Sequence, residues 1–475
     1  MMIVLAILIA FVGLLLIRGA MFTPKDESSA IDSVESVDRD QTISHLQALI
    51  RAKTISYRDH SLEDEAEFEK LEALLLKLFP HVASHCTFVK PGPRSLLFHW
   101  KGKSAENPSV LMAHYDVVPV NEEAWEKPAF DAVLEDGILW GRGVLDTKGT
   151  LLGIMEAADA LIAEGFQPAH DLYLAFAGDE EISGTGAPAI IEWFQQNGIS
   201  PYFVLDEGGA VVENVFPGVH VPSAMIGTGE KGPMDVRLVL DSTGGHASTP
   251  PPHTSVGQLA EAVRRIENHP FPFTLTPPAA KMFDTLGRHS TFLYRVIFAN
   301  LWFFKPVLNI ICKSSGGELN ALVRTTVAFT QMQGGEASNV LPPHAWVGAN
   351  LRLIGGETVE SVKAYLEKVI SNDKIKVEVV QGMNPSAISS TDSEPWQRLC
   401  GAVRATWTDA VVSPYLMLAC SDSRHYSPIC PHVYRFSAMA LSKAERGMIH
   451  ANNERVPVET IVKCVAFYRR MIKAC

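Results

Sequence analysis

Two rhythms of apolar residues in the first half of the chain predict alternating strands and helices. Three short apolar runs, in SVLMAHYDVVP, DLYLAFAGDEE and PYFVLDEGG, each end in polar residues. Apolar residues recur at helical spacing in residues 149–164 and 187–197, and two more helices are predicted upstream at residues 43–52 and 62–78. Strands that alternate with helices are typical of an α/β fold, with a mainly parallel sheet covered by helices on both faces.

The pattern changes after about residue 229. MDVRLVLDS alternates like a half-exposed strand, and Thr254 or Ser255 can cap a helix that follows it. TVAFTQMQGG and AWVGANLRLIGG predict two more strands, and Thr358 starts a second helix. This order predicts a small α+β sandwich with its helices on one face. We expect it to be a separate domain at residues 229–375, inserted between catalytic parts at residues 42–228 and 376–475.

The N-terminus is almost entirely apolar. Residues 1–17 carry no charge, and Arg18 and Lys25 follow. This length is at the lower limit for a spanning helix, and no A-x-A cleavage site follows it. We expect residues 1–22 to be an uncleaved, single-pass membrane anchor and residues 23–41 to be a polar linker. The alternatives are a cleaved signal, which would give a secreted or periplasmic protein, and a buried helix.

A second apolar stretch, at residues 271–312, lies inside the inserted domain. Arg295, Asn300 and Pro306 interrupt it, so the sequence predicts a packing surface or a substrate channel there rather than a membrane span.

Composition narrows the class of protein. The chain has 475 residues, of which 47% are hydrophobic and 20% charged, which is ordinary for a globular protein of two or three domains. The net charge of −12 and the lack of a Lys/Arg-rich run argue against nucleic acid as a partner. Seven irregularly spaced cysteines without CxxC exclude a zinc ribbon and a dense disulfide framework.

Candidate metal chemistry begins with His114, Asp116 and Asp146. Residues two apart on a strand point to one side, so His114 can ligate a metal ion while Asp116 orients its ring. Asp146 lies in the glycine-rich LWGRGVLDTKG, where its two oxygens can bridge two metal ions. Taken alone, these residues also fit strand-end hydrogen bonds and a helix N-cap.

Three consecutive acids, Asp179, Glu180 and Glu181, follow the second apolar run. Their repulsion is costly unless a cation offsets it. One acid can ligate a metal ion while the next serves as general base, and the residues themselves leave open which does which. A solvated acidic turn is the alternative.

Asp206 ends the third run, and His450 lies near the C-terminus in MIHANNE. The combined set has two histidines and at least three carboxylates, and its first four sites stand at or just after strand-like runs. Ligands gather at the carboxyl ends of strands in open α/β sheets. Mixed imidazole and carboxylate ligation suits zinc better than cobalt or manganese.

Several longer motifs occur in a characteristic order: HYDVVP, WGRGVLDTKG, GDEEISGTG, LDEGG and GGHAS. In this the chain resembles the co-catalytic zinc peptidase family of aminoacylase-1, acetylornithine deacetylase, succinyl-diaminopimelate desuccinylase and carboxypeptidase S. RTT from Arg324, SDSRHY from Ser421 and IHANNE from Ile449 make it most similar to the carboxypeptidase S and N-fatty-acyl-amino-acid hydrolase branch. That branch also carries an N-terminal hydrophobic segment.

The resemblance implies a ligand set for two zinc ions. His114 and Asp206 would hold one ion, and Glu181 and His450 would hold the other. Asp146 would bridge them.

The resemblance also implies the other site residues. Glu180 would be the general base, and Asp116 would orient the first histidine ligand. His246, in the inserted domain, would polarise the scissile carbonyl, in many relatives from the partner subunit. Asn339 and Arg352 would bind substrate, and a guanidinium fork suits a terminal carboxylate. RLIGG departs from the many relatives that have Pro before the last Gly, which leaves the assignment of Arg352 intact.

We therefore expect hydrolysis of an amide bond in peptides or N-acyl amino acids with a free carboxylate. Glu180 would take a proton from a water held by two zinc ions and pass it to the leaving amine. A homodimer is expected through the inserted domain, which would act as a lid. The alternatives are a strict carboxypeptidase or dipeptidase, a single-metal aminopeptidase lacking a bridging acid such as Asp146, and a catalytically dead, membrane-anchored binding protein.

Overall fold

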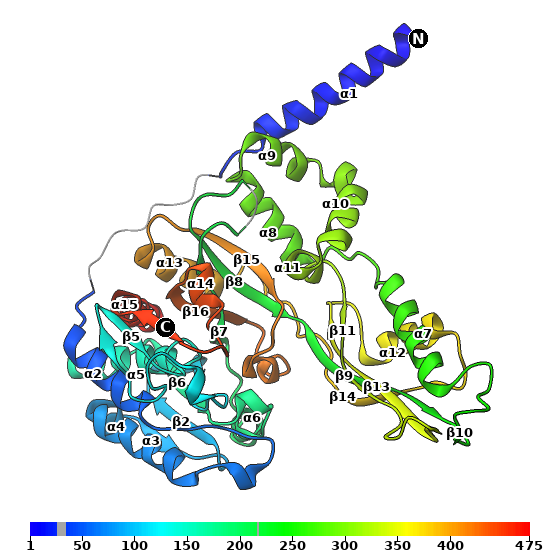
Figure 1. The fold of residues 1–475 in the computed structure, drawn as a ribbon. Helices are drawn as coiled ribbons and strands as arrows, with labels where there is room; N and C mark the ends of the chain where they lie inside the picture. Colours follow the sequence, from blue (N-terminus) through cyan, green and yellow to red (C-terminus); the bar gives the residue numbers. More distant parts are fainter. Residues whose placement is uncertain (26–34, 216–217) are drawn as a thin grey trace.

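An eight-stranded sheet forms the centre of the protein in a computed structural model, which describes residues 1–25, 35–215 and 218–475 (Figure 1). Strands β6, β3, β7 and β16 run parallel, β1 and β2 join antiparallel at one edge, and β8 and β15 form a parallel pair at the other. In sheet order, the strands are β1 (Thr87–Val89), β2 (Ser95–Trp100), β6 (His170–Ala177), β3 (Ser104–His114), β7 (Phe203–Val212), β16 (Val433–Ala440), β8 (Ser223–Glu230) and β15 (Val411–Met417).

Helices cover both faces of this sheet. On β3, Leu111 joins a core shared with α5 (Lys148–Ala163) and α15 (Val458–Ala474), whereas its neighbours Val110 and Met112 join a core shared with α6 (Gly186–Gln196). Successive strand residues point to opposite faces, and both faces are apolar, which explains the continuous hydrophobic runs. The α/β fold class predicted from the sequence is confirmed.

Capping residues set where the first helices of the catalytic unit begin. α2 (Arg39–Ile50) starts earlier than the predicted residue 43 because the Asp38 carboxylate accepts a hydrogen bond from the Gln41 backbone N–H. Asp64 caps α3 (Glu65–Leu78) in the same way, through the Ala66 N–H. The remaining elements of this unit are α4 (Pro80–His85), α13 (Glu394–Thr406), α14 (Lys443–Arg446) and a small sheet of β4 (Leu134–Glu135), β5 (Ile138–Trp140) and β17 (Arg455–Pro457).

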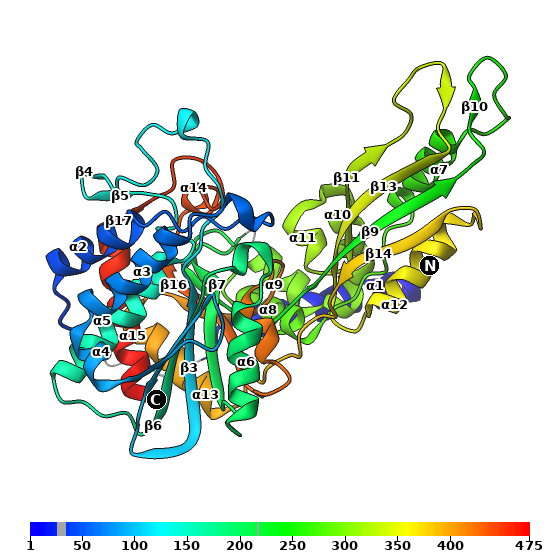
Figure 2. The same cartoon turned by 90° about the horizontal axis from the view of Figure 1, so that it is seen from below.

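The second unit is a four-stranded antiparallel sheet with two helices, and its core is separate from that of the central sheet. It extends away from the catalytic unit (Figure 2). Its elements are β9 (Gly232–Asp241), α7 (Ser255–Asn268), β11 (Thr326–Gln333), β13 (His344–Leu353), α12 (Val359–Ile370) and β14 (Lys376–Gly382). β14 pairs with β9, so the second unit continues past residue 375, where the sequence analysis ended the inserted domain. Val377 is buried while the rest of this edge strand is exposed, so its pattern was weak.

The apolar stretch at residues 271–312 is mostly helical, with its first helix beginning at Pro277. α8 (Pro277–Arg288) packs against β15 of the central sheet. α9 (Phe292–Ala299) and α10 (Leu301–Ser315) meet at an angle of 107°, and α11 (Gly317–Ala321) follows. Much of α10 is exposed rather than packed in the core.

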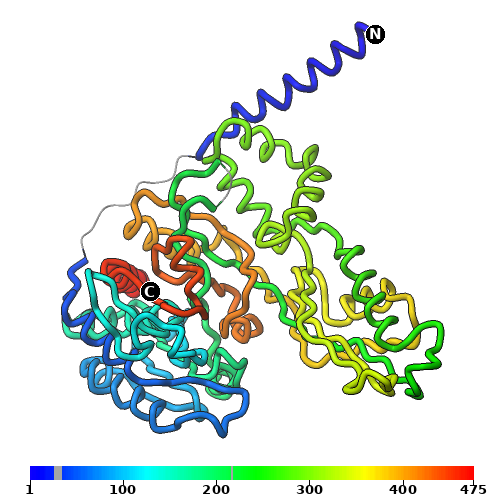
Figure 3. The backbone as a smooth tube through the Cα atoms, in the orientation of Figure 1, coloured from blue at the N-terminus to red at the C-terminus, as the bar shows by residue number. Residues whose placement is uncertain are grey.

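The N-terminal helix α1 (Met2–Met21) projects from the body of the protein (Figure 3). Among the described residues it is the one single helix long and apolar enough to cross a membrane. Its last turns pack on α9. Residues 26–34 of the predicted linker lie outside the described residues. The seven cysteines, all of which are described, are free thiols.

We expect Arg435 to be a strong determinant of stability. Its side chain is fully buried where β16 meets β8, and Nε lies 3.3 Å from Oε2 of Glu230, which is equally buried. Arg435→Met would leave the Glu230 charge buried without its cation, which typically costs about 3–5 kcal/mol. Denaturant unfolding should show this loss, and adding Glu230→Gln should recover part of it.

The exposed pair of Arg264 and Glu261 on α7 supplies a matched control. Arg264→Met should leave the free energy of unfolding nearly unchanged, because exposed ion pairs contribute little. Equal effects of the two arginine substitutions would contradict the assignment.

Candidate metal centre

The carboxyl ends of three neighbouring strands bring the candidate residues together. His114 is the last residue of β3, Glu180 and Glu181 follow β6, and Glu207 lies within β7. Because β6, β3 and β7 are adjacent and parallel, these side chains meet at the carboxyl ends of the strands. Asp146 approaches from the segment before α5, across a cis peptide bond to Thr147.

Asp146 lies between two imidazole rings. His114 Nε2 is 3.1 Å from its Oδ1, and His450 Nε2 is 2.9 Å from its Oδ2. His450 Nε2 is also 3.0 Å from Oε2 of Glu181. Atoms of His114, Asp146 and Glu181 lie within 4.8 Å of one another, a spacing that suits shared metal ligation. The two oxygens of one carboxylate therefore face two different histidines.

Glu207, which the sequence analysis did not select, points into this cluster instead of its neighbour Asp206. Glu207 Oε1 is 3.6 Å from His114 Nε2, and His114, Glu180 and Glu207 form a second group of donors within 4.8 Å. Asp206 instead accepts a hydrogen bond of 2.8 Å from the Ser423 backbone N–H. Adjacent strand residues point to opposite sides, so one acid of the LDEGG motif had to face away. Because the strand is buried on both faces, its sequence pattern does not say which of the two acids that is.

Asp116 organises the first histidine and the acidic turn together. Its Oδ1 is 3.2 Å from Nδ1 of His114, and its backbone carbonyl oxygen is 3.1 Å from the same nitrogen. Its oxygens also accept hydrogen bonds from the backbone N–H groups of Glu180 and Glu181, and from the Ser56 hydroxyl at 2.6 Å. The Glu180 carboxylate lies 3.7 Å from Nη1 of Arg424. Asp116 therefore contacts both the His114 ring and the turn that carries Glu180 and Glu181.

Glu454 holds the segment that carries Asp146, a role the sequence analysis did not detect although IHANNE was among its motifs. Its buried carboxylate accepts hydrogen bonds from the backbone N–H groups of Gly143 and Leu145, at 3.0 and 2.7 Å, and from Arg142. Gly143 has a φ of +88°, which glycine adopts without strain. Nothing in the sequence pattern alone joins residues this far apart.

The acids in the cluster are largely buried, with side-chain exposures of 13% for Glu180 and 14% for Glu207. Burial raises the pKa of both carboxyls well above their usual value, and negative neighbours raise it further, chiefly Asp422 for Glu180 and Asp146 for Glu207. Burial also raises the pKa of Glu181. Without a cation, these acids therefore tend to keep protons.

The crowded acids also raise the pKa of both histidines. Burial lowers the pKa of His114, but the negative charge of Glu207 and other acids outweighs it and raises the pKa well above its usual value. Hydrogen bonds to Asp146 and Glu181 raise the pKa of His450 to about 10. Burial raises the pKa of Asp146, yet its hydrogen bonds to both rings hold that pKa well below the usual range.

The donor set fits two divalent cations. Two imidazoles and several carboxylates converge, and a carboxylate stands between the rings where a bridging ligand is required. Divalent charge would also offset the repulsion among the buried acids. Nitrogen and oxygen ligands of this kind suit zinc.

The predicted residues of the inserted domain lie in two different places. His246, on β10 (Gly245–His246), pairs with Val340 on β12 (Val340–Leu341), and the Ala247 N–H donates to the Asn339 carbonyl. The structure thus brings His246 and Asn339 together at the outer tip of the second unit (Figure 2). β10 follows the outer end of β9, a ten-residue strand that spans roughly 30 Å. Neither residue reaches the metal cluster in this arrangement.

Arg352 lies at the other end of the second sheet, next to the catalytic unit. Its Nη1 is 3.0 Å from the Cys420 sulfur, and Cys420 Sγ is 3.2 Å from the Lys231 carbonyl oxygen. Burial lowers the pKa of Lys231 to about 7, and the positive charge of Arg352 contributes to that shift. The Arg352 guanidinium thus lies near enough to Lys231 to disfavour its charged form where the two units join.

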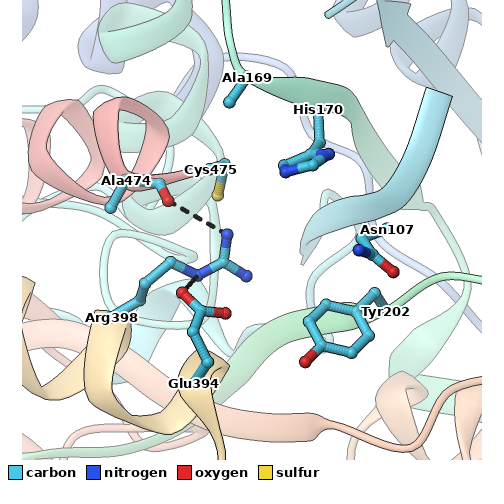
Figure 4. A pocket seen from close by; sticks show the side chains of 8 residues that line it. All are labelled: Asn107, Ala169, His170, Tyr202, Glu394, Arg398, Ala474 and Cys475. Atoms are coloured by element: carbon cyan, nitrogen blue, oxygen red, sulfur yellow. Dashed lines mark hydrogen bonds and ion pairs between the residues drawn. The ribbon is translucent and has the colours of Figure 1, made fainter. Parts of the chain in front are cut away.

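A separate cavity of about 330 Å³ lies near the amino ends of the central strands, opposite the metal cluster (Figure 4). His170 stands at the start of β6, and Tyr202 just precedes β7, whereas the metal cluster lies at the other ends of these strands. Arg398 on this wall is held by Glu394 at 3.3 Å and by the Ala474 carbonyl at 3.1 Å. The candidate site residues, all of them described, are not part of this lining.

Comparison with known proteins finds a peptidase family and relatives that match most of this chain. Residues 110–474 match the family described as peptidase family M20/M25/M40. The N-fatty-acyl-amino acid synthase/hydrolase PM20D1 of Xenopus tropicalis is 34% identical over 477 residues, covering 98% of this chain and 93% of that protein. A probable carboxypeptidase S-like 2 of Dictyostelium discoideum is 33% identical over 481 residues, covering 98% and 92%.

Solved structures share the fold at low sequence identity. The M20 family metallo-carboxypeptidase Sso-CP2 from Sulfolobus solfataricus has a TM-score of 0.65 at 17% identity, covering 91% of this chain and 98% of that one. Human carnosine dipeptidase 1 has a TM-score of 0.63 at 14% identity, covering 92% and 96%.

Metal binding should release protons. The metal-free cluster has raised pKa values at Glu180, Glu181 and Glu207 and at both histidines, and ligands must be deprotonated. Titrating zinc into metal-depleted protein near neutral pH should release at least about one proton per chain, seen as a dependence of the binding enthalpy on buffer ionisation. The release should shrink as pH rises, because fewer protons remain to be displaced. Binding without proton release would mean that the metal sits elsewhere.

Proposed function

Since the chain belongs to peptidase family M20/M25/M40, we propose that it hydrolyses the amide bond of N-acyl amino acids, or of peptides, that carry a free carboxylate, with two zinc ions per chain. The observation that carries this proposal is Asp146, whose two oxygens face His114 and His450 separately. A bridging carboxylate between two ligand sets is what a two-metal hydrolytic site requires.

The ligand assignment follows the distances. His114 and Glu207 would hold one ion, His450 and Glu181 the other, and Asp146 would bridge. Glu207 takes the position that the sequence analysis gave to Asp206, whose carboxylate is already engaged by the Ser423 N–H. Bound ions would lower the pKa of a water molecule toward neutrality.

Glu180 is the proposed general base. It belongs to the group of donors with His114 and Glu207, but it has Arg424 as its neighbour rather than Asp146 and His450. Its backbone is held by Asp116, so the carboxylate is aimed at the cluster. A raised pKa suits a group that accepts a proton from water and returns it to the leaving amine.

The substrate carboxylate is assigned to Arg352. Arg352 lies beside Cys420 in the corner where the units join, and a guanidinium fork matches a carboxylate geometrically. The acyl group is suggested by the Xenopus relative, whose name specifies N-fatty-acyl amino acids.

His246 and Asn339 would complete the site from the second unit. Their place at its outer tip means that this unit must close, or that a partner subunit must supply the pair through a homodimer. His246 would then donate to the developing oxyanion. The packing of α1 on α9 supports an N-terminal membrane anchor, because it makes this helix part of the folded protein.

Glu180→Gln tests the hydrolytic proposal. We expect it to keep its metal while kcat falls by roughly 10²–10⁴-fold, because the general base is lost and the ligands remain. Activity should be measured on a long-chain N-acyl amino acid and on a dipeptide, with metal analysis of the same preparation. Glu69→Gln on the exposed face of α3 should retain full activity. Cleavage of the dipeptide alone would favour a strict dipeptidase.

The neighbouring acids of β7 provide a second prediction. Glu207→Gln should reduce zinc content by about one equivalent per chain, since it removes a ligand from one of two sites. Asp206→Asn, one residue away, should retain both equivalents and instead destabilise the segment around Ser423. The reverse pattern, with metal lost from Asp206→Asn alone, would restore the ligand predicted from sequence.

A further inference from the structure

Helices α9 and α10 expose large apolar side chains on one side of the protein. Trp302 is 60% exposed and Ile310 66%. The full set comprises Phe292, Leu293, Trp302, Phe303, Val307, Ile310 and Ile311. On α10, positions 303, 307, 310 and 311 follow helical spacing and therefore form one stripe. A contiguous apolar surface of this kind marks an interaction site.

The apolar helix α1 lies directly against this surface. The Phe11 ring is 5.1 Å from the Phe303 ring and 6.2 Å from the Trp302 ring, between centroids. α1 also packs along α9. The exposed stripe of α10 is therefore continuous with the exposed apolar surface of α1.

Polar contacts fix α1 in this position. Arg18 Nε donates to Asn300 Oδ1 and Arg18 Nη2 donates to the Ala299 carbonyl, both at 2.9 Å. The buried Asn300 amide donates in turn to the Leu15 carbonyl at 3.1 Å. A Cβ on Gly19 would lie 2.4 Å from Val296 Cγ2, so the two backbones approach as closely as glycine permits.

The helical rise of α1 gives the depth in a membrane at which its neighbouring side chains would lie. Phe11 precedes Arg18 by seven residues, which is about 10 Å of helix at about 1.5 Å per residue. If Arg18 marks the membrane surface, the side chains touching Phe11 must also lie below that surface. Helices that lie in the interface bury their apolar face to about 5–10 Å.

We propose that α10 lies in the interfacial layer of the same bilayer that α1 crosses, with Trp302 and Phe303 immersed among lipid chains. α1 and α10 together then fix the orientation of the catalytic unit relative to the membrane.

The charges on these helices fit a lipid surface. Residues 292–315 contain Arg295, Lys305 and Lys313 and no acidic residue. Long basic side chains can keep their charge at the headgroups while their stems lie on apolar surface. Basic residues at the interface are also attracted to anionic lipids.

Lipid quenching of Trp302 tests this placement in the full-length protein. The protein is reconstituted in vesicles of phosphatidylcholine with a minor fraction of phosphatidylglycerol, with bromine either near the headgroup or near the chain terminus. The Trp302 signal is the difference between wild type and Trp302→Phe. We expect it to fall roughly twofold or more, most strongly with bromine near the headgroup.

Trp346 on β13 is the matched control, taken from Trp346→Phe in the same way, and its signal should not change. Two outcomes would overturn the proposal. If Trp302 is shielded from aqueous acrylamide yet unaffected by brominated lipid, α10 contacts another copy of the chain instead. If acrylamide quenches Trp302 freely, the stripe faces water.

Paired charge substitutions add a second measurement. Val307→Glu with Ile310→Glu should markedly reduce lipid quenching of Trp302, because buried carboxylates are costly in the interface. Met332→Glu with Val380→Glu places the same charges on exposed residues of β11 and β14 and should leave the quenching intact. Turnover of a soluble substrate checks that each variant is folded. Because the main readout is fluorescence, the result stands apart from the proposed amide hydrolysis.

Discussion

Mutual repulsion among acids at one edge of the central sheet constrains the whole catalytic unit. Glu180, Glu181, Glu207 and Asp146 converge where water is largely excluded, so each needs a cation or a hydrogen-bond donor. Histidine rings flank Asp146. Two other acids accept hydrogen bonds from backbone N–H groups and so position the segments that carry the site residues. Asp116 holds the acidic turn and Glu454 holds the loop before α5. The path of these loops therefore follows from the need to aim carboxylates at one point.

The second unit contributes to the site from two distant ends of one sheet. Arg352 meets the catalytic unit beside Cys420, whereas His246 lies at the outer tip. The corner at Arg352 is also connected to α10, because Lys231 donates to the Arg324 carbonyl and Arg324 donates to Asn309 at 2.6 Å. The surface proposed to meet lipid and the corner proposed to bind a carboxylate thus share one set of contacts.

Much of the architecture could be predicted because both sheets leave periodic signals. The α/β class and the small sandwich followed from apolar rhythm and cap residues, and the motifs singled out in the sequence include His114, Asp146, Glu181 and His450, which converge in the structure. Asp206 and Glu207 could not be separated, since a strand buried on both faces shows no polar alternation to say which side each residue faces. β14 was missed because an edge strand buries little, and Glu454 because its partners lie about three hundred residues away.

The contacts of Asn300 with α1 affect which measure of substrate concentration governs the rate of turnover. A catalytic unit on a flexible linker moves through the surrounding solution. The relevant substrate concentration is then the bulk concentration in moles per litre. A unit held rigidly to a helix in the bilayer instead meets lipid-soluble molecules by lateral diffusion, at a fixed height. For an N-acyl amino acid dissolved in the membrane, the governing quantity becomes its mole fraction among the lipids. Adding inert lipid at constant bulk substrate would then slow turnover by dilution in two dimensions.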